Sequence, residues 1–285
     1  MRIAVVGQIA RDLVLVVPEV PDAGATSPVL ERREVLGGKG ANIAVDVVQL
    51  GASASLIGVA GDDEIGDRLV EQLQADGVDT SSVARRGRSA LIVDVVCDGK
   101  WRYLQDIPDT SLVAPTDLGP SVAEADAVVV QLQQPHETSL AAARRAAGLV
   151  VLDGVATPDL LAAADVLRAD QHEGEELTGR SITSSGDALA AGRNLLDRGP
   201  SLVALEVKGE ANVLVWPSGE AVVPLTDVDV VDTTGGGDAF VAALTVALAR
   251  GERPEEAGRL AVAAAGRAVD HAGGRTDLGG LRGHR

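Results

Sequence analysis

The feature that most constrains this fold is the alternation of short, uninterrupted apolar runs with longer stretches of helical periodicity. The runs RIAVVG (2–7) and LVALEV (202–207) contain almost no alternating polar positions, so strands formed from them would be buried on both faces. Such strands, joined by helices, are typical of parallel sheets with crossover connections. We therefore predict an α/β fold with a mostly parallel sheet. Further strands are predicted at 55–59, 127–132, 149–154 and 165–169, and helices at 41–50, 63–76, 138–147, 158–163, 173–178, 185–198, 238–250 and 254–271.

Two stretches, 12–35 and 88–107, break this rhythm. Both indicate short alternating strands, with turn signals at Pro21-Asp22 and Asp98-Gly99. We interpret them as a small sheet inserted into the α/β body. Because no internal repeat or flexible linker interrupts the chain, one domain is expected over residues 1–285.

Charge and cysteine content exclude several classes of function. The chain has 25 basic and 42 acidic residues, a net charge of −17, which repels nucleic acids and anionic membranes. Its single cysteine, Cys97, rules out an intrachain disulfide and the common cysteine-rich zinc sites. The first residues lack the order of a signal peptide, and no apolar run is long enough for a membrane span. We expect a cytoplasmic protein with neither nucleic-acid nor membrane partners.

The strongest local signal is VVDTTGGGDAFVAALTVALARG, at residues 230–251. Three glycines lead from an apolar strand end into a predicted helix, so backbone N–H groups can converge at the positive end of a helix dipole. This arrangement suits phosphate. Taken alone, the motif is equally compatible with a plain turn and a helix capped by Asp238.

A second glycine-rich loop, LGGKGANIAVDVVQLGA, spans residues 36–52. It is not a Walker A loop, because Lys39 is followed by Gly40, and Gly7 near the N-terminus lacks the companions of a dinucleotide fingerprint. In isolation, Lys39 and Asn42 are also compatible with a solvated loop lysine and an amide in a first helical turn.

Together and in this order, the two glycine-rich segments resemble the signature stretches of the ribokinase-like, or phosphofructokinase-B-type, family of sugar kinases. The resemblance implies a three-layer α/β sandwich with a small β-sheet lid at 12–35 and 88–107. It also implies ATP-dependent phosphorylation of a substrate hydroxyl. Further stretches in the family order are 7–12, 58–66, 170–179 and 207–216.

The resemblance assigns roles to individual residues. Asp238 would be the general base that takes the proton from the attacking hydroxyl, and Gly235, Gly236 and Gly237 would supply N–H donors to the transferred phosphoryl group. The residues implied in substrate binding are Asp12, Gly38, Lys39, Asn42, Gln133 and Asp238.

On the nucleotide side, Asp170 replaces the usual asparagine and Glu173 would organise Mg²⁺ through water. Lys208 could equally be a solvent-facing residue at a strand end. The full set implied to bind ATP is Asp170, Glu173, Val207, Lys208, Gly209, Gly235 and Gly237.

The resemblance further suggests a potassium site. His271 would contribute only its backbone there, and is equally compatible with an ordinary helix-end histidine. The residues of this site would be Asp232, Thr234, Ala268, His271, Gly273 and Asp277.

The substrate is expected to be a free pentose or hexose. Ala10 and Gln133 stand where ribokinases commonly carry Asn and Glu, so two hydroxyl partners are altered. A nucleoside is the alternative, but Trp101 and Tyr103, on one predicted strand face, are the only aromatic pair that could hold a base. A noncatalytic sugar-binding homologue is a further alternative, although Asp238 argues against it.

A phosphorylated sugar would require basic residues near the sugar end. Lysine occurs only at 39, 100 and 208, which leaves Arg11 and Arg102 as candidates. Arg11 should point to the strand face opposite Asp12. The apolar face of the inserted sheet is expected to form a homodimer.

Overall fold

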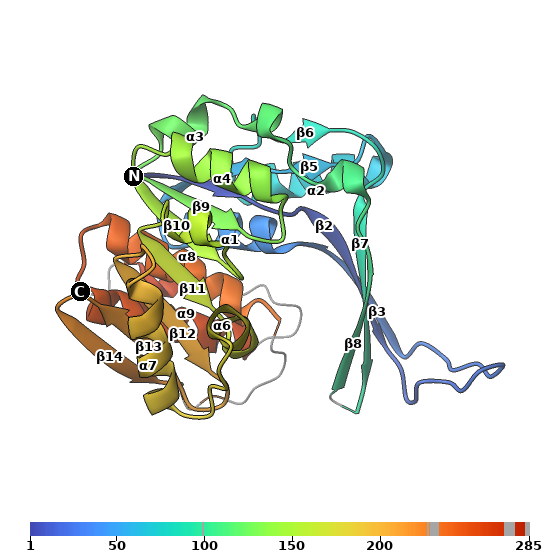
Figure 1. Cartoon of the computed structure of the whole chain (residues 1–285). Helices are drawn as coiled ribbons and strands as arrows, with labels where there is room; N and C mark the ends of the chain where they lie inside the picture. The colour runs from blue at the N-terminus through green and yellow to red at the C-terminus, as the bar shows by residue number, and fades with distance from the viewer. Residues whose placement is uncertain (99, 227, 229–233, 271–276, 283–285) are drawn as a thin grey trace.

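A large sheet of eight strands forms the centre of the molecule in the computed structural model, which describes residues 1–98, 100–226, 228, 234–270 and 277–282 (Figure 1). Six neighbouring strands of this sheet pair in parallel, and two strands at one edge continue it antiparallel. The strand order is β14 (Gly219–Pro224), β13 (Ala211–Trp216), β12 (Leu202–Val207), β11 (Val166–Ala169), β10 (Leu149–Asp153), β9 (Ala127–Gln131), β1 (Arg2–Val6) and β4 (Ser53–Ile57).

All six predicted apolar runs form strands of this sheet, which confirms the mostly parallel architecture. Strands β13 and β14 lie outside the runs predicted as strands from the sequence. They extend the sheet as consecutive hairpins after β12, and β14 alternates between half-buried and exposed residues because it forms the sheet edge.

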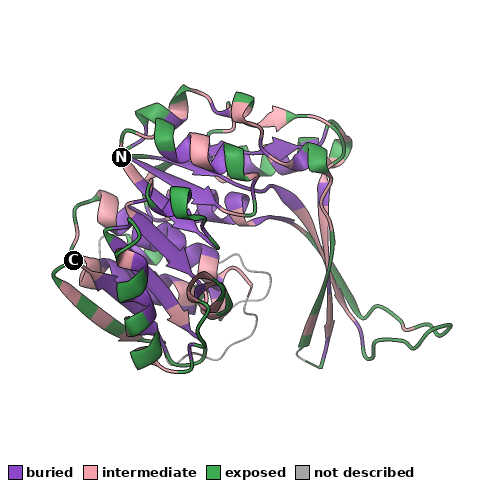
Figure 2. Ribbon diagram, viewed as in Figure 1, coloured by how far each residue is buried: buried purple, intermediate pink, exposed green. Residues whose placement is uncertain are grey.

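Helices cover both faces of the large sheet, which gives the three layers (Figures 1 and 2). One face packs against α1 (Lys39–Gln49), α2 (Glu64–Ala75), α8 (Gly236–Ala249) and α9 (Pro254–Val269). The other packs against α3 (Pro120–Glu124), α4 (His136–Arg145), α5 (Pro158–Leu161), α6 (Gln171–Thr178) and α7 (Ser185–Leu196). Smaller elements are β5 (Val59–Ala60), β6 (Ala84–Arg85) and the short 3₁₀ turns Asp109–Ser111, Pro115–Asp117 and Gly279–Leu281.

A second sheet of four strands projects from one side of this body (Figure 1). We call it the small sheet; its order is β3 (Glu31–Gly37), β2 (Ala10–Val16), β7 (Ala90–Cys97) and β8 (Lys100–Asp106). Cys97 pairs with Lys100, so the predicted turn at 98–99 joins β7 to β8, although residue 99 lies outside the described part.

The turn predicted at Pro21-Asp22 lies within the connection between the adjacent antiparallel strands β2 and β3, but this connection is not a tight hairpin. Instead, β2 ends at Val16 and β3 begins at Glu31, and residues 17–30 form a long, mostly exposed connection (Figure 2). Pro18, Pro21 and Pro28 lack the N–H group that a strand ladder needs, which explains why neither strand extends further. None of the helices in the described ranges is long and apolar enough to cross a membrane.

Candidate active site

A row of polar side chains marks the carboxyl end of the large sheet. Gln131 pairs in register with Asp153, which pairs with Arg168 on the next strand. The alternation of side chains places all three on the same face as Val129 and Val166, toward α1 and α8. All three are buried, so they are polar groups in otherwise apolar surroundings. Ligands of open α/β sheets bind at this edge.

The N-terminus of α8 lies over this row. Gly235 adopts a left-handed backbone (φ 78°) as the residue before the helix, and no side chain caps the helix there. A residue with a β-carbon would be strained in that conformation. The first N–H groups of α8 are therefore available to an anion, as the three glycines predict.

Asp238 is the third residue of α8, so the alternative that it caps the helix is wrong. Its side chain is 6% exposed and accepts a hydrogen bond of 2.9 Å from Nδ2 of Asn42. Burial raises the pKa of Asp238, whereas the charge of Lys39 and the Asn42 hydrogen bond oppose that rise. The site thus holds a desolvated carboxylate beside a cation, which is the environment of a general base.

Helix α1 brings Lys39 and Asn42 to the same place. The helix begins at Lys39, two residues earlier than predicted, so this residue belongs to the first turn and not to a solvated loop. Its Nζ lies 3.9 Å from Oδ2 of Asp153, and the charge of Asp153 raises the pKa of Lys39 against the effect of burial. Gly38 precedes the helix with φ 90°.

Asp12 reaches the site from β2 of the small sheet. A β-carbon on Gly37 would lie only 2.0 Å from Asp12 Oδ2, so glycine is needed for the two strands to hold this carboxylate where it is. Burial, followed by the charges of Asp238 and Asp94, raises the pKa of Asp12 to about 7. Arg11 forms an ion pair of 2.6 Å with Glu34, which fits its predicted orientation away from Asp12.

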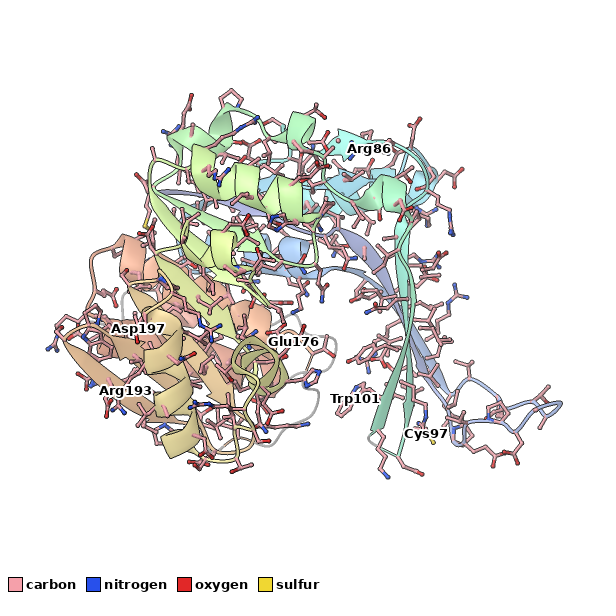
Figure 3. All side chains as sticks on the ribbon, in the orientation of Figure 1. Arg86, Cys97, Trp101, Glu176, Arg193 and Asp197 are labelled. Atoms are coloured by element: carbon pink, nitrogen blue, oxygen red, sulfur yellow. The ribbon has the colours of Figure 1, made fainter. Side chains whose placement is uncertain are left out.

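The same face of the small sheet carries the aromatic pair. Tyr103 pairs with Asp94 and Trp101 with Val96, so both rings share one face. Trp101 lies on the side of β8 that faces the large sheet (Figure 3). The Tyr103 hydroxyl lies 3.2 Å from Oγ1 of Thr234, directly before the glycines of α8. The small sheet therefore touches the segment directly before α8.

Asp170 and Glu173, which the sequence predicts to lie near the nucleotide, form a reciprocal cap at the start of α6. Oδ1 of Asp170 accepts from the Glu173 N–H, and the Asp170 N–H donates to Oε2 of Glu173, both at 2.8 Å. Burial raises the pKa of Glu173. Val207 is buried, whereas Lys208 and Gly209 are exposed, in line with the solvent-facing alternative for Lys208.

These groups fit ATP and Mg²⁺ in a particular way. The uncapped α8 terminus suits the phosphates, and the raised pKa of Glu173 would be relieved by a nearby cation. Within the described ranges, no three Asp, Glu, His or Cys side chains are grouped closely enough to hold a metal by themselves. Mg²⁺ would therefore be held largely by the nucleotide, with Glu173 assisting through water.

The suggested potassium site lies partly outside the described residues, since Asp232, His271 and Gly273 all do. Of the others, Ala268 is buried in α9, and Asp277 is exposed and accepts a hydrogen bond of 2.7 Å from the Gly279 N–H. The potassium site stays a prediction.

Gln133, a predicted substrate residue, lies two residues beyond β9 and is exposed.

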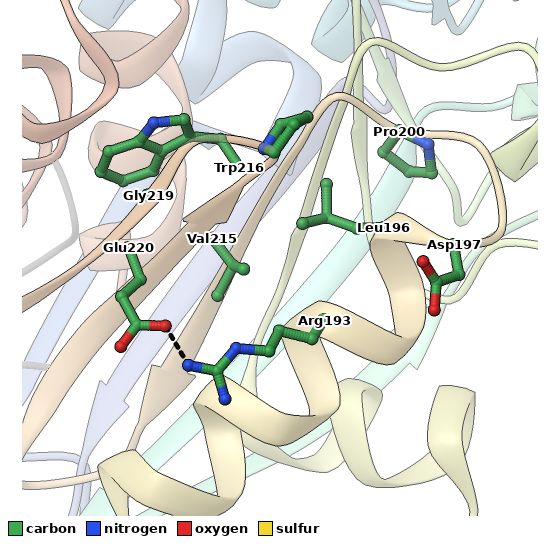
Figure 4. A pocket seen from close by; sticks show the side chains of 9 residues that line it. Arg193, Leu196, Asp197, Pro200, Val215, Trp216, Gly219 and Glu220 are labelled. Atoms are coloured by element: carbon green, nitrogen blue, oxygen red, sulfur yellow. Dashed lines mark hydrogen bonds and ion pairs between the residues drawn. The ribbon is translucent and has the colours of Figure 1, made fainter.

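A surface groove elsewhere, between α7 and the β13–β14 edge, contains the Arg193–Glu220 ion pair and the Trp216 ring (Figure 4). It contains none of the residues predicted to bind substrate, nucleotide or metal, and it is not part of the candidate site.

Three charged residues of the site were not among those predicted from the sequence: Asp94, Asp153 and Arg168. Asp153 and Arg168 lie within the apolar runs LVVLDG and DVLRA, and Asp94 interrupts the alternation of ALIVDVV. A charge inside a run expected to be buried is the signal that could have identified them.

Comparison with known proteins is consistent with this geometry. The sequence pattern of the pfkB family carbohydrate kinases matches residues 1–279. A ribokinase from Bacillus subtilis is 30% identical over 289 residues, covering 94% of this chain and 92% of that protein. An aminoimidazole riboside kinase from Salmonella typhimurium is also 30% identical, over 281 residues that cover 87% of this chain and 81% of the relative.

Among solved structures, the ribokinase of Arabidopsis thaliana complexed with ribose and ATP superimposes with a TM-score of 0.84 at 26% identity. The match covers 95% of this chain and 93% of that one. The ribokinase-like fold, the family pattern over nearly the whole chain and the relatives agree. This chain belongs to the pfkB family of carbohydrate kinases.

Proposed function

We propose that this kinase transfers the γ-phosphoryl group of ATP to a hydroxyl of a free pentose or hexose. The observation that carries the proposal is the convergence of the Asn42–Asp238 hydrogen bond, the Lys39 ammonium and the uncapped α8 terminus beneath Asp12 of the small sheet. Together they supply a base, a cation, anion donors and a hydroxyl acceptor.

In this proposal Asp238 removes the proton of the attacking hydroxyl. Its hydrogen bond to Asn42 fixes the orientation of the carboxylate, and Lys39 favours the ionised form. The N–H groups at Gly235, Gly236 and Gly237 stabilise charge on the transferring phosphoryl group. ATP supplies that group, and its Mg²⁺ offsets phosphate charge.

Asp12, Gly38, Lys39 and Asn42 are the proposed contacts to the other sugar hydroxyls, with Gln133 at the rim. Asp12 accepts and Lys39 donates, which suits an uncharged polyol. A phosphorylated sugar is disfavoured, because Asp12, Asp94 and Asp238 would face its dianion and Arg11 is paired with Glu34 on the opposite strand face.

The small sheet is proposed to act as a lid that excludes water during transfer. The Tyr103–Thr234 contact supports this role, because it joins the small sheet to the phosphate-binding loop.

The opposite face of the small sheet carries apolar residues, among them Leu104 at 65% exposure. We propose that this face pairs with a second copy, and light scattering that shows a monomer at every concentration would refute the dimer.

The proposal is tested by sugar-dependent release of ADP from MgATP, measured with the whole chain over a panel of pentoses, hexoses, deoxy-keto acids, sugar phosphates and nucleosides. A free sugar should give the highest kcat/KM. A higher value for adenosine, pseudouridine or fructose 6-phosphate would refute the substrate class while leaving the kinase assignment intact.

The Asp238→Asn variant tests the chemistry separately. It keeps size and polarity but removes the proton acceptor, so kcat should fall by about 10²–10⁴-fold while the affinities for sugar and ATP change little. Asp22→Asn, the same chemical change on the exposed 17–30 connection, is the matched control. A variant that retains more than about a tenth of wild-type kcat would remove Asp238 from the role of base.

A nucleoside is the second candidate. It is favoured by Trp101 and Tyr103 on the face of the small sheet that reaches the site, and by the similarity to an aminoimidazole riboside kinase. Tyr103 already contacts Thr234, which reduces its freedom to stack on a base. The same substrate panel separates the two candidates.

A further inference from the structure

Arg168 is a cation in an unusual place. It lies on β11 within the central sheet and is 5% exposed, the only arginine or lysine of the described part of the chain to be so deeply buried. Its NH1 donates to Oδ1 of Asp153 at 3.0 Å, and its NH2 lies 3.4 Å from Oε2 of Glu206. Nε has no hydrogen-bond partner among the described residues.

The guanidinium group is pressed against the start of α8. A β-carbon on Gly237 would lie 2.9 Å from NH2 and 3.2 Å from NH1 of Arg168. The Phe240 ring, one turn later, has its centre 6.0 Å from the guanidinium carbon. The positive charge of Arg168 therefore lies under the helical turn that contains Asp238.

Stability does not explain this pair. A buried ion pair contributes little compared with well-packed apolar residues of similar volume, because both charges lose their hydration. The strand neighbours of Arg168 on the same face, Val166 and Val151, pack in the apolar core. The charges at Asp153 and Arg168 thus point to a role in the site above them.

Asp153 is shared between two cations. Oδ1 accepts the Arg168 hydrogen bond, whereas Oδ2 is buried, lies 3.9 Å from Lys39 Nζ and makes no hydrogen bond within the described ranges. At this distance Lys39 is attracted but not bound, so its three N–H donors remain available. Without Arg168, the uncompensated carboxylate would draw the ammonium down toward the sheet.

We propose that Arg168 is a positioning residue for phosphoryl transfer: it binds Asp153 so that Lys39 stays available above the sheet, and it places a fixed positive charge beside the base Asp238. This inference rests on the proposed function.

The charges around Asp238 predict how the pKa of this residue changes when Arg168 or Asp153 is replaced. Asp238 faces Lys39 from α1, Asp12 from β2, Asp153 from β10 and Arg168 from β11. Lys39 and Arg168 lower the pKa of Asp238, whereas Asp153 raises it. Removing Arg168 should therefore raise this pKa, and removing Asp153 should lower it.

The experiment compares Arg168→Gln, Arg168→Lys, Asp153→Asn and the double variant D153N/R168Q with the wild type, on the acceptor that the wild type phosphorylates. The pH dependence of kcat is measured at saturating MgATP, and KM for the acceptor is measured in parallel. Thermal unfolding reports whether each variant is folded.

R168Q should reduce kcat by at least about tenfold. It should also move the acidic limb of the kcat–pH profile to higher pH by about one unit. D153N should move the limb to lower pH, and the double variant should lie between the two. R168K keeps the positive charge, so the acidic limb of its kcat–pH profile should lie close to that of the wild type. A purely structural role would change stability without producing shifts of opposite sign.

The proposal is overturned if the limb does not move in folded R168Q, or if R168Q and D153N move it in the same direction. If R168Q does not fold, R168K and D153N still decide, because the limb of D153N must move to lower pH. The carboxyl carbon of Asp238, followed by NMR in aspartate-labelled protein, reports the same shifts without turnover. A wild type that phosphorylates no acceptor would refute the proposed function alone.

Discussion

Replacing Asp12 by Asn should make the sugar-free protein more stable at neutral and alkaline pH. The Asp12 carboxylate is held against Gly37 and faces Asp238 and Asp94. Burial and these two charges raise the pKa of Asp12 to about 7, from an ordinary value of 3.8. The folded protein therefore keeps a proton that the unfolded chain releases between these two values.

The size of the effect follows from that interval. Each pKa unit corresponds to about 1.36 kcal/mol, so the ionised Asp12 costs the folded state up to about 4 kcal/mol above pH 7. Below pH 3.8 both states are protonated and the cost vanishes. The wild type should thus lose stability relative to Asp12→Asn by about 2.5 kcal/mol between pH 5 and pH 8, a change in Tm of about 4 °C for a chain of this length.

The assay is denaturant or thermal unfolding of both proteins at pH 5, 6, 7 and 8, without sugar or nucleotide. Asp22→Asn, on the exposed 17–30 connection, is the matched control and should follow the wild type at every pH. Calorimetry should show that Asp12→Asn also weakens sugar binding, by about 1–3 kcal/mol. Stability curves of Asp12→Asn and wild type that run parallel across this pH range would refute the reasoning.

Two further outcomes follow from the same face of the small sheet. Asp94→Asn removes one of the charges that repel Asp12, so the midpoint pH of the stability loss should be lower in this variant than in the wild type. The same unfolding series measures this midpoint, and an unchanged value would show that the two carboxylates do not interact. Tyr103→Phe removes the hydroxyl contact to Thr234 and should raise KM for the acceptor by about fivefold or less with kcat little changed, whereas a loss confined to kcat would contradict a closing role.

The sequence alone determined the layered α/β architecture. Apolar runs such as 127–132 and 202–207 can satisfy their backbone and bury both faces only in the middle of a sheet, and the helices between them impose parallel pairing. The glycine-rich segments likewise indicated where helices α1 and α8 begin, to within two residues. Apolar runs and glycine-rich helix starts are local features of the chain, so they can be recognised in a single sequence.

The tertiary structure decided which charges meet. Asp12, Asp153 and Arg168 are separated by up to 156 residues, and only strand order and register bring them near Asp238. The raised pKa of Asp12 depends on burial beneath groups from other strands and helices, which no local pattern records. Pairing between segments also decides the extent of the 17–30 connection and the position of β13 and β14 at the sheet edge. Alternation of side chains indicates a strand but does not show which strand it pairs with.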